Sequence, residues 1–339
     1  MSQTRRAFLR SSLGAIAAAH VPASCTKSAR EVVVYTSVDQ PFSEPVLKAF
    51  QEQTGVAAPA VFDTEETKST GVLNRLIAEG TNPRADVFWS GDPVRPFLLM
   101  KRGLVAPYTS PAAAGIPAAF KGADGSWTGF AARARVLLVN KGRLGAGEMP
   151  RSLRDLADPR YKGQTAIANP LFGTTTIHVA ALFAVWGEER AKAFMTSLKE
   201  AGTRVASSNG EVKRLVVAGE VTFGLTDTDD AAEAVKQGAA VEVVYPDQDE
   251  AGTLVMPTTV VLLRGPHPET GRQLIDYLLS ADVERRLAES AAQMPLRAGV
   301  PTPPGGRSVA SIRAMEVDYG KVADEMERIQ PWLRVWSGL

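Results

Sequence analysis

Three aspartates lie close together in the sequence, directly after an apolar run that is typical of a buried strand. The run is 221–225, and it is followed by Thr226, Asp227, Asp229 and Asp230. Carboxylates at such a position favour a metal cation, an ammonium group or the hydroxyls of a sugar. Asp227 is the strongest single candidate because it follows the strand so closely. The alternative is a solvated loop or a helix cap.

Hydroxyl-bearing residues, with an asparagine and a glycine, lie at or just before the start of two of the expected helices. They come from the segments 169–176 and 207–210, and the candidates are Asn169, Gly173, Thr174, Thr175 and Ser208. Hydroxyls and free N–H groups at the start of a helix suit an anion. Ordinary N-capping explains these residues equally well. Together with the aspartates, they predict a solute that carries both charge signs.

The first third of the chain has polar residues after each of its three expected strands. The candidates are Ser37 and Asp39 after the first strand, Glu65, Thr67 and Ser69 after the second, and Ser90 and Asp92 after the third. Tyr35 and Trp89 lie at strand ends, where a ring can stack on a solute or close the core. We include Tyr35 among the binding candidates and interpret Trp89 as core.

Two arginines and a histidine complete the set of residues that could do chemistry. Arg133 and Arg135 flank an expected passage between two halves of the chain, where they can clamp an anion or form an ion pair. His178 lies in an apolar helical pattern, and we interpret it as structural. We expect Asp227→Ala to weaken solute binding without unfolding the protein.

The elements that must position these residues alternate between strands and helices. Apolar, β-branched runs at 32–36, 58–62 and 86–89 are each followed by a helical pattern, and the same order restarts near 135. Such alternation predicts an α/β fold with two mixed or parallel sheets flanked by helices. In such sheets a ligand lies at the carboxyl ends of the strands, and the candidate residues come from the loops that follow these ends.

A hinge between two lobes is the arrangement that this order favours. We place the crossovers near 130–136 and 252–260. The first lobe is then discontinuous and comprises 30–130 with 257–339, whereas the second lobe comprises 131–256.

Composition excludes several classes of function. The 339 residues carry 38 Lys and Arg against 37 Asp and Glu, so nucleic acid is not expected as a partner. One cysteine and three histidines exclude a site rich in Cys or His ligands. Nucleophile-elbow, P-loop and dinucleotide-binding patterns are missing, and we expect a binding protein with no required cofactor, not an enzyme; an exported hydrolase is the distant alternative.

The first 25 residues have the parts of an export signal. Arg5 and Arg6 precede a short apolar stretch, 13–19, in the manner of a twin-arginine signal. Cleavage by an ordinary signal peptidase and acylation of Cys25 at a lipoprotein-type end both remain open. Either route predicts a periplasmic protein, and acylation would tether it to the membrane.

Several short segments, taken in order, resemble the extracellular solute-binding proteins of ABC importers. The segments are VVVYTS at 32–37, FQEQTG at 50–55, PRADVF at 83–88, RGLV at 102–105, LADPRYKG at 156–163, GTLVMP at 252–257, YLLS at 277–280 and QMPLR at 293–297. The resemblance is strongest to the ferric-iron-binding-like branch. It implies a two-lobed periplasmic-binding-protein fold of type II, a monomer that closes on a solute, and delivery to a membrane permease.

The chain departs from the iron-binding pattern at one place. Iron-binding members of the family use adjacent tyrosines as ligands, but the matching stretch 226–230 contains none. Carboxylates can supply hard oxygen ligands instead, so Fe(III) or another metal–anion complex remains the first expectation. The alternative solute is an organic anion or zwitterion such as a phosphonate or a sugar phosphate.

Overall fold

The computed structural model describes residues 30–63, 70–145, 149–303 and 306–339. The predicted export signal with Cys25 lies outside these ranges, as do the candidates Glu65, Thr67 and Ser69. Within the described ranges, no helix is both long and apolar enough to cross a membrane.

In the described ranges, ten strands form two sheet regions that share one long strand. The first region contains β1 (Val34–Thr36), β2 (Ala60–Phe62), β3 (Val87–Ser90), β4 (Val105–Ala106) and β10 (Val255–Leu263). The second contains β6 (Thr165–Ala168), β7 (Arg204–Ala206), β8 (Phe223–Asp227) and β9 (Val241–Val244). The strand order is β2-β1-β3-β10-β5-β8-β6-β7, with β4 on β10 and β9 on β5. Both regions therefore mix parallel and antiparallel pairs, as expected for this fold class.

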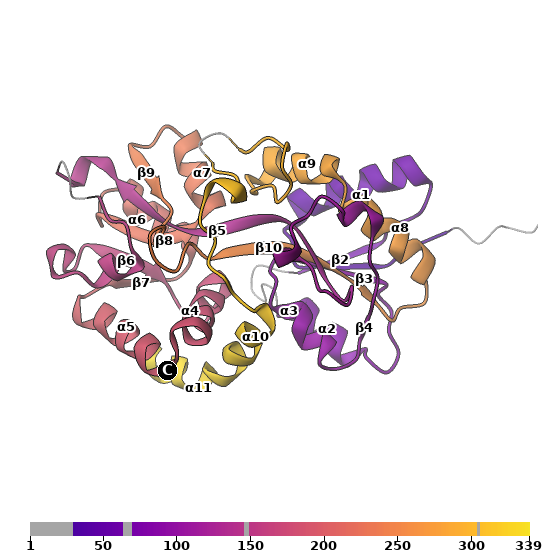
Figure 1. Ribbon diagram of the computed structural model, residues 1–339, viewed down its shortest axis with the longest axis horizontal. Helices are drawn as coiled ribbons and strands as arrows, with labels where there is room; N and C mark the ends of the chain where they lie inside the picture. Colours follow the sequence, from indigo (N-terminus) through magenta and orange to yellow (C-terminus); the bar gives the residue numbers. More distant parts are fainter. Residues whose placement is uncertain (1–29, 64–69, 146–148, 304–305) are drawn as a thin grey trace, which may run out of the picture.

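Strand β5 (Thr128–Asn140) joins the two regions. It pairs with β10 from Thr128 to Ala134 and with β8 from Arg135 onward. Ala131 is the extra residue of a bulge, since the register shifts opposite it and its φ is 48°. Figure 1 shows β5 and β10 running between the two halves of the molecule.

Helices cover both sheet regions (Figure 1). Those around the first are α1 (Gln40–Thr54), α2 (Gly71–Ala78), α3 (Arg95–Met100), α8 (Pro268–Leu278) and α9 (Ala281–Ala291). Those around the second are α4 (Gly173–Trp186), α5 (Glu188–Glu200), α6 (Asn209–Val217) and α7 (Thr228–Lys236). We call each sheet region with its helices the first lobe and the second lobe. The two-lobed α/β fold is as predicted.

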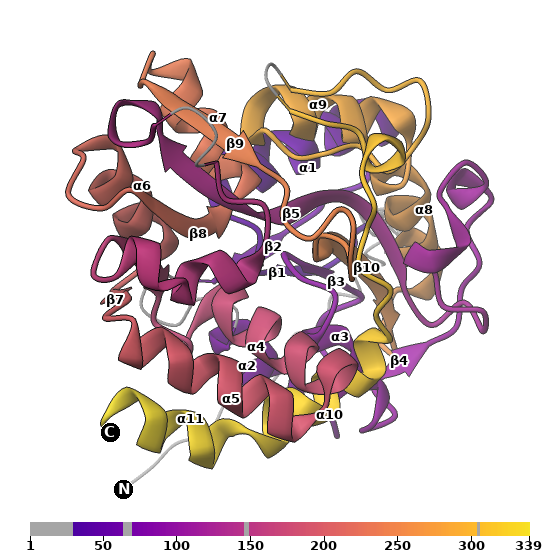
Figure 2. The ribbon, with the colours of Figure 1, turned by 60° about the vertical axis from the view of Figure 1, so that its left-hand side comes forward.

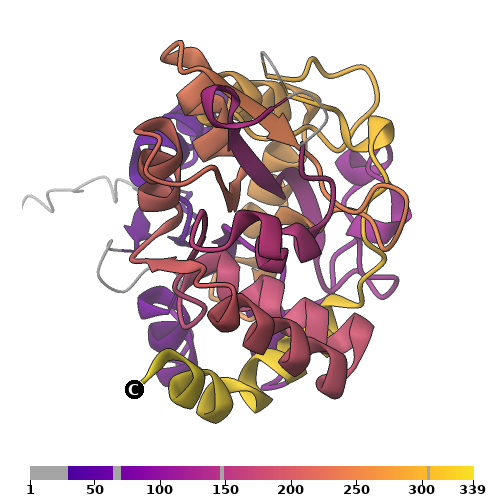
Figure 3. The same ribbon diagram turned by 90° about the vertical axis from the view of Figure 1, so that its left-hand side faces the viewer.

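The last two helices of the described residues lie against the second lobe. The prediction from the sequence places all of 257–339 in the first lobe. Helix α10 (Tyr319–Arg328) packs on α4, and α11 (Gln330–Ser337) lies beside α5 in Figures 2 and 3. Trp336 donates its indole N–H to the carbonyl of Met195 at 2.9 Å. An amphipathic helix packs wherever its apolar face finds a partner, and periodicity alone does not name that partner. The predicted lobe bounds themselves stay a prediction.

Candidate ligand-binding site

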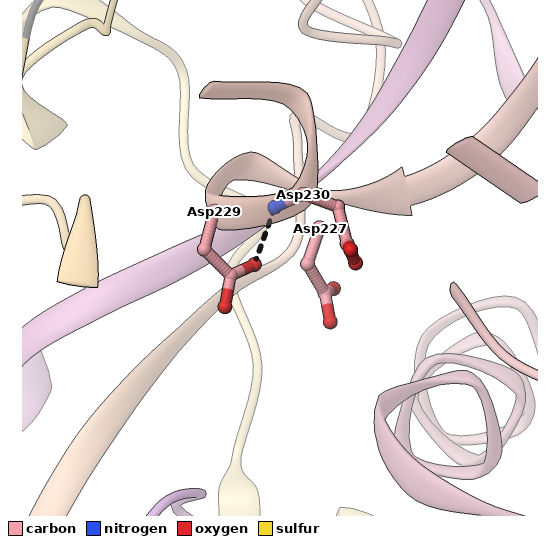
Figure 4. A group of neighbouring side chains, drawn as sticks. All are labelled: Asp227, Asp229 and Asp230. Carbon is pink, nitrogen blue, oxygen red and sulfur yellow. Dashed lines mark hydrogen bonds between the residues drawn. The ribbon is translucent and has the colours of Figure 1, made fainter. Parts of the chain in front are cut away.

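The three aspartates of the sequence motif come together where β8 ends and α7 begins. One carboxylate oxygen each from Asp227, Asp229 and Asp230 lies within 4.8 Å of the others. Figure 4 shows the three side chains pointing to the same side of this turn, with the Asp230 N–H donating to Asp229. We call these residues the acidic group. Oxygen donors this close together can hold a cation if nothing else compensates their charge.

Asp227 is already paired, because Arg135 on β5 lies directly beside it. The Arg135 guanidinium donates to one Asp227 oxygen at 2.7 Å, and Thr174 donates to the other at 2.7 Å. Asn209 also donates to Asp227, at 3.1 Å, and Arg135 donates to Thr174 and Thr175. Arg135 is fully buried and Asp227 nearly so. This buried network ties β5, β8 and the first turns of α4 and α6 together.

The three carboxylates of the acidic group differ in pKa. Burial alone would raise the pKa of Asp227, but the charges of Arg135 and Arg133 and the hydrogen bonds keep that pKa below its usual value. Burial raises the pKa of Asp229 in spite of Arg133. Burial, followed by the charges of Asp229 and Asp227, raises the pKa of Asp230 to about 7. The three carboxylates therefore do not act as three equivalent anions.

Arg133 connects the acidic group to the first lobe. Its guanidinium donates to the Gly91 carbonyl, in the loop after β3, at 2.7 Å and lies 3.4 Å from the Asp229 carboxylate. The Gly91 N–H in turn donates to the Ser37 hydroxyl at 3.0 Å. Burial opposes the charge of Arg133, yet the surrounding carboxylates, Asp229 first, raise the pKa of this guanidinium and keep it charged.

The N-terminus of α4 offers donors beside this network. No side chain of the described residues caps it, and Gly173 at its first position is exposed with φ near 60°. The first N–H groups of a helix have no partner within the helix and favour an anion. Helix α6 differs, because the Ser208 hydroxyl accepts from Glu211 and caps it. Ser208 therefore acts as an N-cap, the alternative explanation considered for it.

Several candidates have other described partners. The Tyr35 hydroxyl donates to Glu79 at the end of α2, 2.9 Å away. Asp92 accepts from the first N–H groups before α3 and pairs with Arg95. Ser90 accepts from Asp92, Asn169 accepts from Leu171, and Thr226 donates to Asp230. Trp89 is buried against Phe130, with 5.8 Å between ring centroids. These contacts are those of turns, caps and core.

Asn209 contributes to the Arg135–Asp227 network, whereas the sequence analysis names only its neighbour Ser208 as a binding candidate. It follows Ser208 directly, so its place at the start of a helix was the only available signal. Arg135 was considered, but its partner was not assigned. His178 is structural, as predicted: its Nδ1 accepts from the Arg135 Nε at 3.4 Å. Burial, helped by the charge of Arg135, lowers the pKa of His178 to about 3.

Two of the small cavities among the described residues each lie within one lobe. One of about 20 Å³ lies in the second lobe beside His178, Thr175 and Leu225. The other, of about 10 Å³, lies in the first lobe beside Glu79 and Leu104. Spaces of this size hold a water molecule at most and are far too small for a solute. Neither cavity is therefore a candidate solute site.

Two α/β lobes joined by β5 and β10, with charged side chains between them, define a hinged binding protein. The sequence matches the family of bacterial extracellular solute-binding proteins over residues 82–305. The chain belongs to this family, and the predicted role as the solute-binding component of an ABC importer is confirmed.

Known relatives support the same assignment. Iron uptake protein A1 of Synechocystis is 28% identical over 85% of this chain and 81% of its own length. A protein of Salmonella paratyphi A, named as a candidate 2-aminoethylphosphonate-binding periplasmic protein, is 25% identical over 93% and 90%. The crystal structure of iron-bound HitA from Pseudomonas aeruginosa has the same fold, with a TM-score of 0.79, 24% identity and coverage of 91% and 100%. The predicted resemblance to the ferric-iron-binding-like branch is confirmed.

Proposed function

We propose that the solute of this protein carries an anionic group together with a cationic centre, and that it binds between the two lobes. The observation that carries the proposal is the uncapped N-terminus of α4, next to the Arg135 network and the acidic group. The helix N-terminus and Arg133 suit the anion. Asp229 and Asp230 suit the cationic centre. Binding of this kind makes and breaks no covalent bond, and we propose no enzymatic activity.

An organic zwitterion is the first candidate for this solute. Asp227 is committed to Arg135, so the acidic group does not offer three free carboxylates. The contacts described for the six tyrosines also lie elsewhere: Tyr35 with Glu79, Tyr108 with Asp276, Tyr161 with Phe223, Tyr245 with Arg307, Tyr277 with Phe50 and Tyr319 with Val255. Among the described contacts, none supplies the phenolate ligands that the resemblance implies for iron. The Salmonella relative points to an aminophosphonate.

Ferric iron with a companion anion is the second candidate. Three carboxylate oxygens within 4.8 Å of one another favour it, and so does the similarity to iron uptake protein A1. In this case Asp229 and Asp230 would bind the metal, and the anion would lie at the start of α4. The iron is cargo in this reading, and no resident cofactor is proposed.

Calorimetry with a matched pair of variants tests the position of the anion. We expect wild type to bind 2-aminoethylphosphonate more tightly than Fe(III)-citrate or a sugar phosphate. A Cβ at Gly173 meets no described atom within 4 Å, and the strain that its positive φ imposes on a side chain is shared by Asp and Asn, so the pair differs mainly in charge. Gly173→Asp places a negative charge at the start of α4 and should weaken binding roughly tenfold or more relative to the isosteric Gly173→Asn. Equal affinities of the two variants would exclude this anion position, whereas binding of Fe(III)-citrate alone would favour the second candidate.

We also propose that the protein works as an exported monomer that delivers its solute to a membrane permease. The basis is the twin-arginine-like segment before residue 25 and the extracellular family to which the chain belongs. Cell fractionation should find the full chain outside the cytoplasm, and Arg5→Lys with Arg6→Lys should retain it inside. Membrane association lost in Cys25→Ser would indicate acylation; unchanged partitioning would exclude it.

A further inference from the structure

Arg133 differs from the other charged groups of the site because its contacts reach both lobes. It donates to Gly91 of the first lobe at 2.7 Å and lies 3.4 Å from Asp229 of the second. Arg133 lies on β5, next to the residue at which the pairing of that strand passes from β10 to β8. A cation held at this place attracts the two lobes toward each other.

Among the neighbouring carboxylates, Asp229 is the one in described ion-pair contact with this cation. Arg133 is surrounded by Asp229, Asp227, Asp39 and Asp92. Asp227 is paired with Arg135, and Asp92 is paired with Arg95. Asp229 has the Arg133 guanidinium as its described ion-pair partner, and its side chain remains 33% exposed. The pair is therefore close enough to attract and open enough for a solute to reach it.

One donor of Arg133 has no described hydrogen-bond partner. Its Nε is buried and has no hydrogen-bond partner among the described residues. A buried N–H group without a partner costs free energy, and an anionic oxygen would satisfy it. The Arg133 side chain is 23% exposed, so the anion of a solute can also contact this guanidinium beside Asp229.

We infer that Arg133 is a specificity-determining residue: it is a built-in cation that joins the lobes through Gly91 and Asp229 and takes the place of a bare metal ion. The inference rests on the proposed function, because it concerns a solute captured between the lobes. Arg133 compensates the charge of Asp229, so a bare cation gains little there. A solute that also brings an anion gains the contact with Arg133. The site then selects against free metal ions.

Two variants of Arg133 and one matched control test this inference. Arg133→Gln removes the charge, whereas Arg133→Lys keeps it. Arg143 is the control, because it also donates to a glycine carbonyl, that of Gly219, but on the surface of the second lobe only. Thermal unfolding of each variant verifies that it folds.

Small-angle scattering without added solute measures the closure of the lobes. We expect Arg133→Gln to have a larger radius of gyration than wild type, with Arg133→Lys and Arg143→Gln close to wild type. Equal radii for wild type and Arg133→Gln would overturn the role of Arg133 in joining the lobes.

Titration with terbium(III), a hard cation whose luminescence reports binding, measures the rejection of bare metal ions. We expect Arg133→Gln to bind terbium(III) about tenfold more tightly than wild type, since a charge-assisted contact is of that size. The double variant Arg133→Gln with Asp229→Asn should lose this gain in terbium(III) affinity, and Arg143→Gln should bind terbium(III) as wild type does. Equal terbium affinity in wild type and Arg133→Gln would overturn the inference. If these differences appear but wild type binds no anionic or zwitterionic solute, the proposed function fails instead.

Discussion

Arg133 and Arg135 are two residues apart on one strand, yet they have different surroundings. Arg135 is fully buried within the second lobe and is bonded to Asp227, Thr174, Thr175 and Asn209. The Arg133 side chain remains 23% exposed and has partners in both lobes. One arginine therefore holds a lobe together, while the other is placed to affect how the lobes meet.

The crossing of the strand between the sheets explains this difference. Side chains two apart on a strand normally share one face and one set of neighbours. Here Arg133 pairs in register with Met256 of β10, whereas Arg135 pairs with Asp227 of β8. The bulge at Ala131 bends the strand just before this change. Two nearby residues of one strand can thus have different roles: Arg135 stabilises the second lobe, and Arg133 acts on the closure of the two lobes.

The largest effect should come from breaking the Arg135 network. Asp227→Ala leaves the Arg135 guanidinium buried without a counter-charge, and removing one partner of a buried pair costs about 3–5 kcal/mol. Urea unfolding should show this loss. The structure therefore changes the expectation from the sequence, which was weaker binding with the fold intact. Stability within about 1 kcal/mol of wild type would contradict the importance of the network.

A double replacement provides the control for that experiment. Arg135→Met combined with Asp227→Leu removes both charges and replaces them with apolar volume. Because such exchanges are often neutral or stabilising, the double variant should lose less stability than Asp227→Ala alone. A loss equal to or greater than that of the single variant would mean that the hydroxyl and amide partners, not the charges, dominate.

The free energy of unfolding below neutral pH should depend on His178. Its folded pKa, about 3, lies below the ordinary histidine pKa of 6.5, so between these pH values the unfolded chain binds the additional proton. The stability due to neutral His178 is complete above pH 6.5 and is lost as the pH falls toward 3. His178→Gln keeps an acceptor for Arg135 and should lower the slope of stability against pH in this window by up to about 1.4 kcal/mol per unit. An unchanged slope would show that His178 is protonated in the folded protein.

The smallest effect on stability should come from Arg133. Its pair with Asp229 is partly exposed and 3.4 Å long, and such pairs contribute about 0–1 kcal/mol. Urea unfolding of Arg133→Gln should stay within that range of wild type, although closure and metal binding change. A loss as large as that of Asp227→Ala would show that the two arginines have the same structural role.

The sequence predicted much of the fold but only part of the site. Apolar runs and helical periodicity identified the alternating strands and helices, because these patterns are local. The segment 226–230 and the segment 169–176 were both singled out, and the structure brings Asp227 and Thr174 into contact. Tyr35 and Asp92 were selected by position alone, and their described partners are Glu79 and Arg95. A polar residue at a strand end is less available to a solute when a nearby cap or ion pair already engages it.

By itself, the sequence determined the α/β fold, the family and the presence of both charge signs in the loops. Each of these follows from residue types and local spacing. Only the tertiary structure decided which charges compensate each other. Arg135 and Asp227 are 92 residues apart in the chain, and their contact depends on β5 pairing with β8. The same pairing gives Arg135 and Arg133 different neighbours. Arg135 lies where β5 pairs with β8, whereas Arg133 lies where β5 pairs with β10, and the paired strand determines which charged groups are within reach.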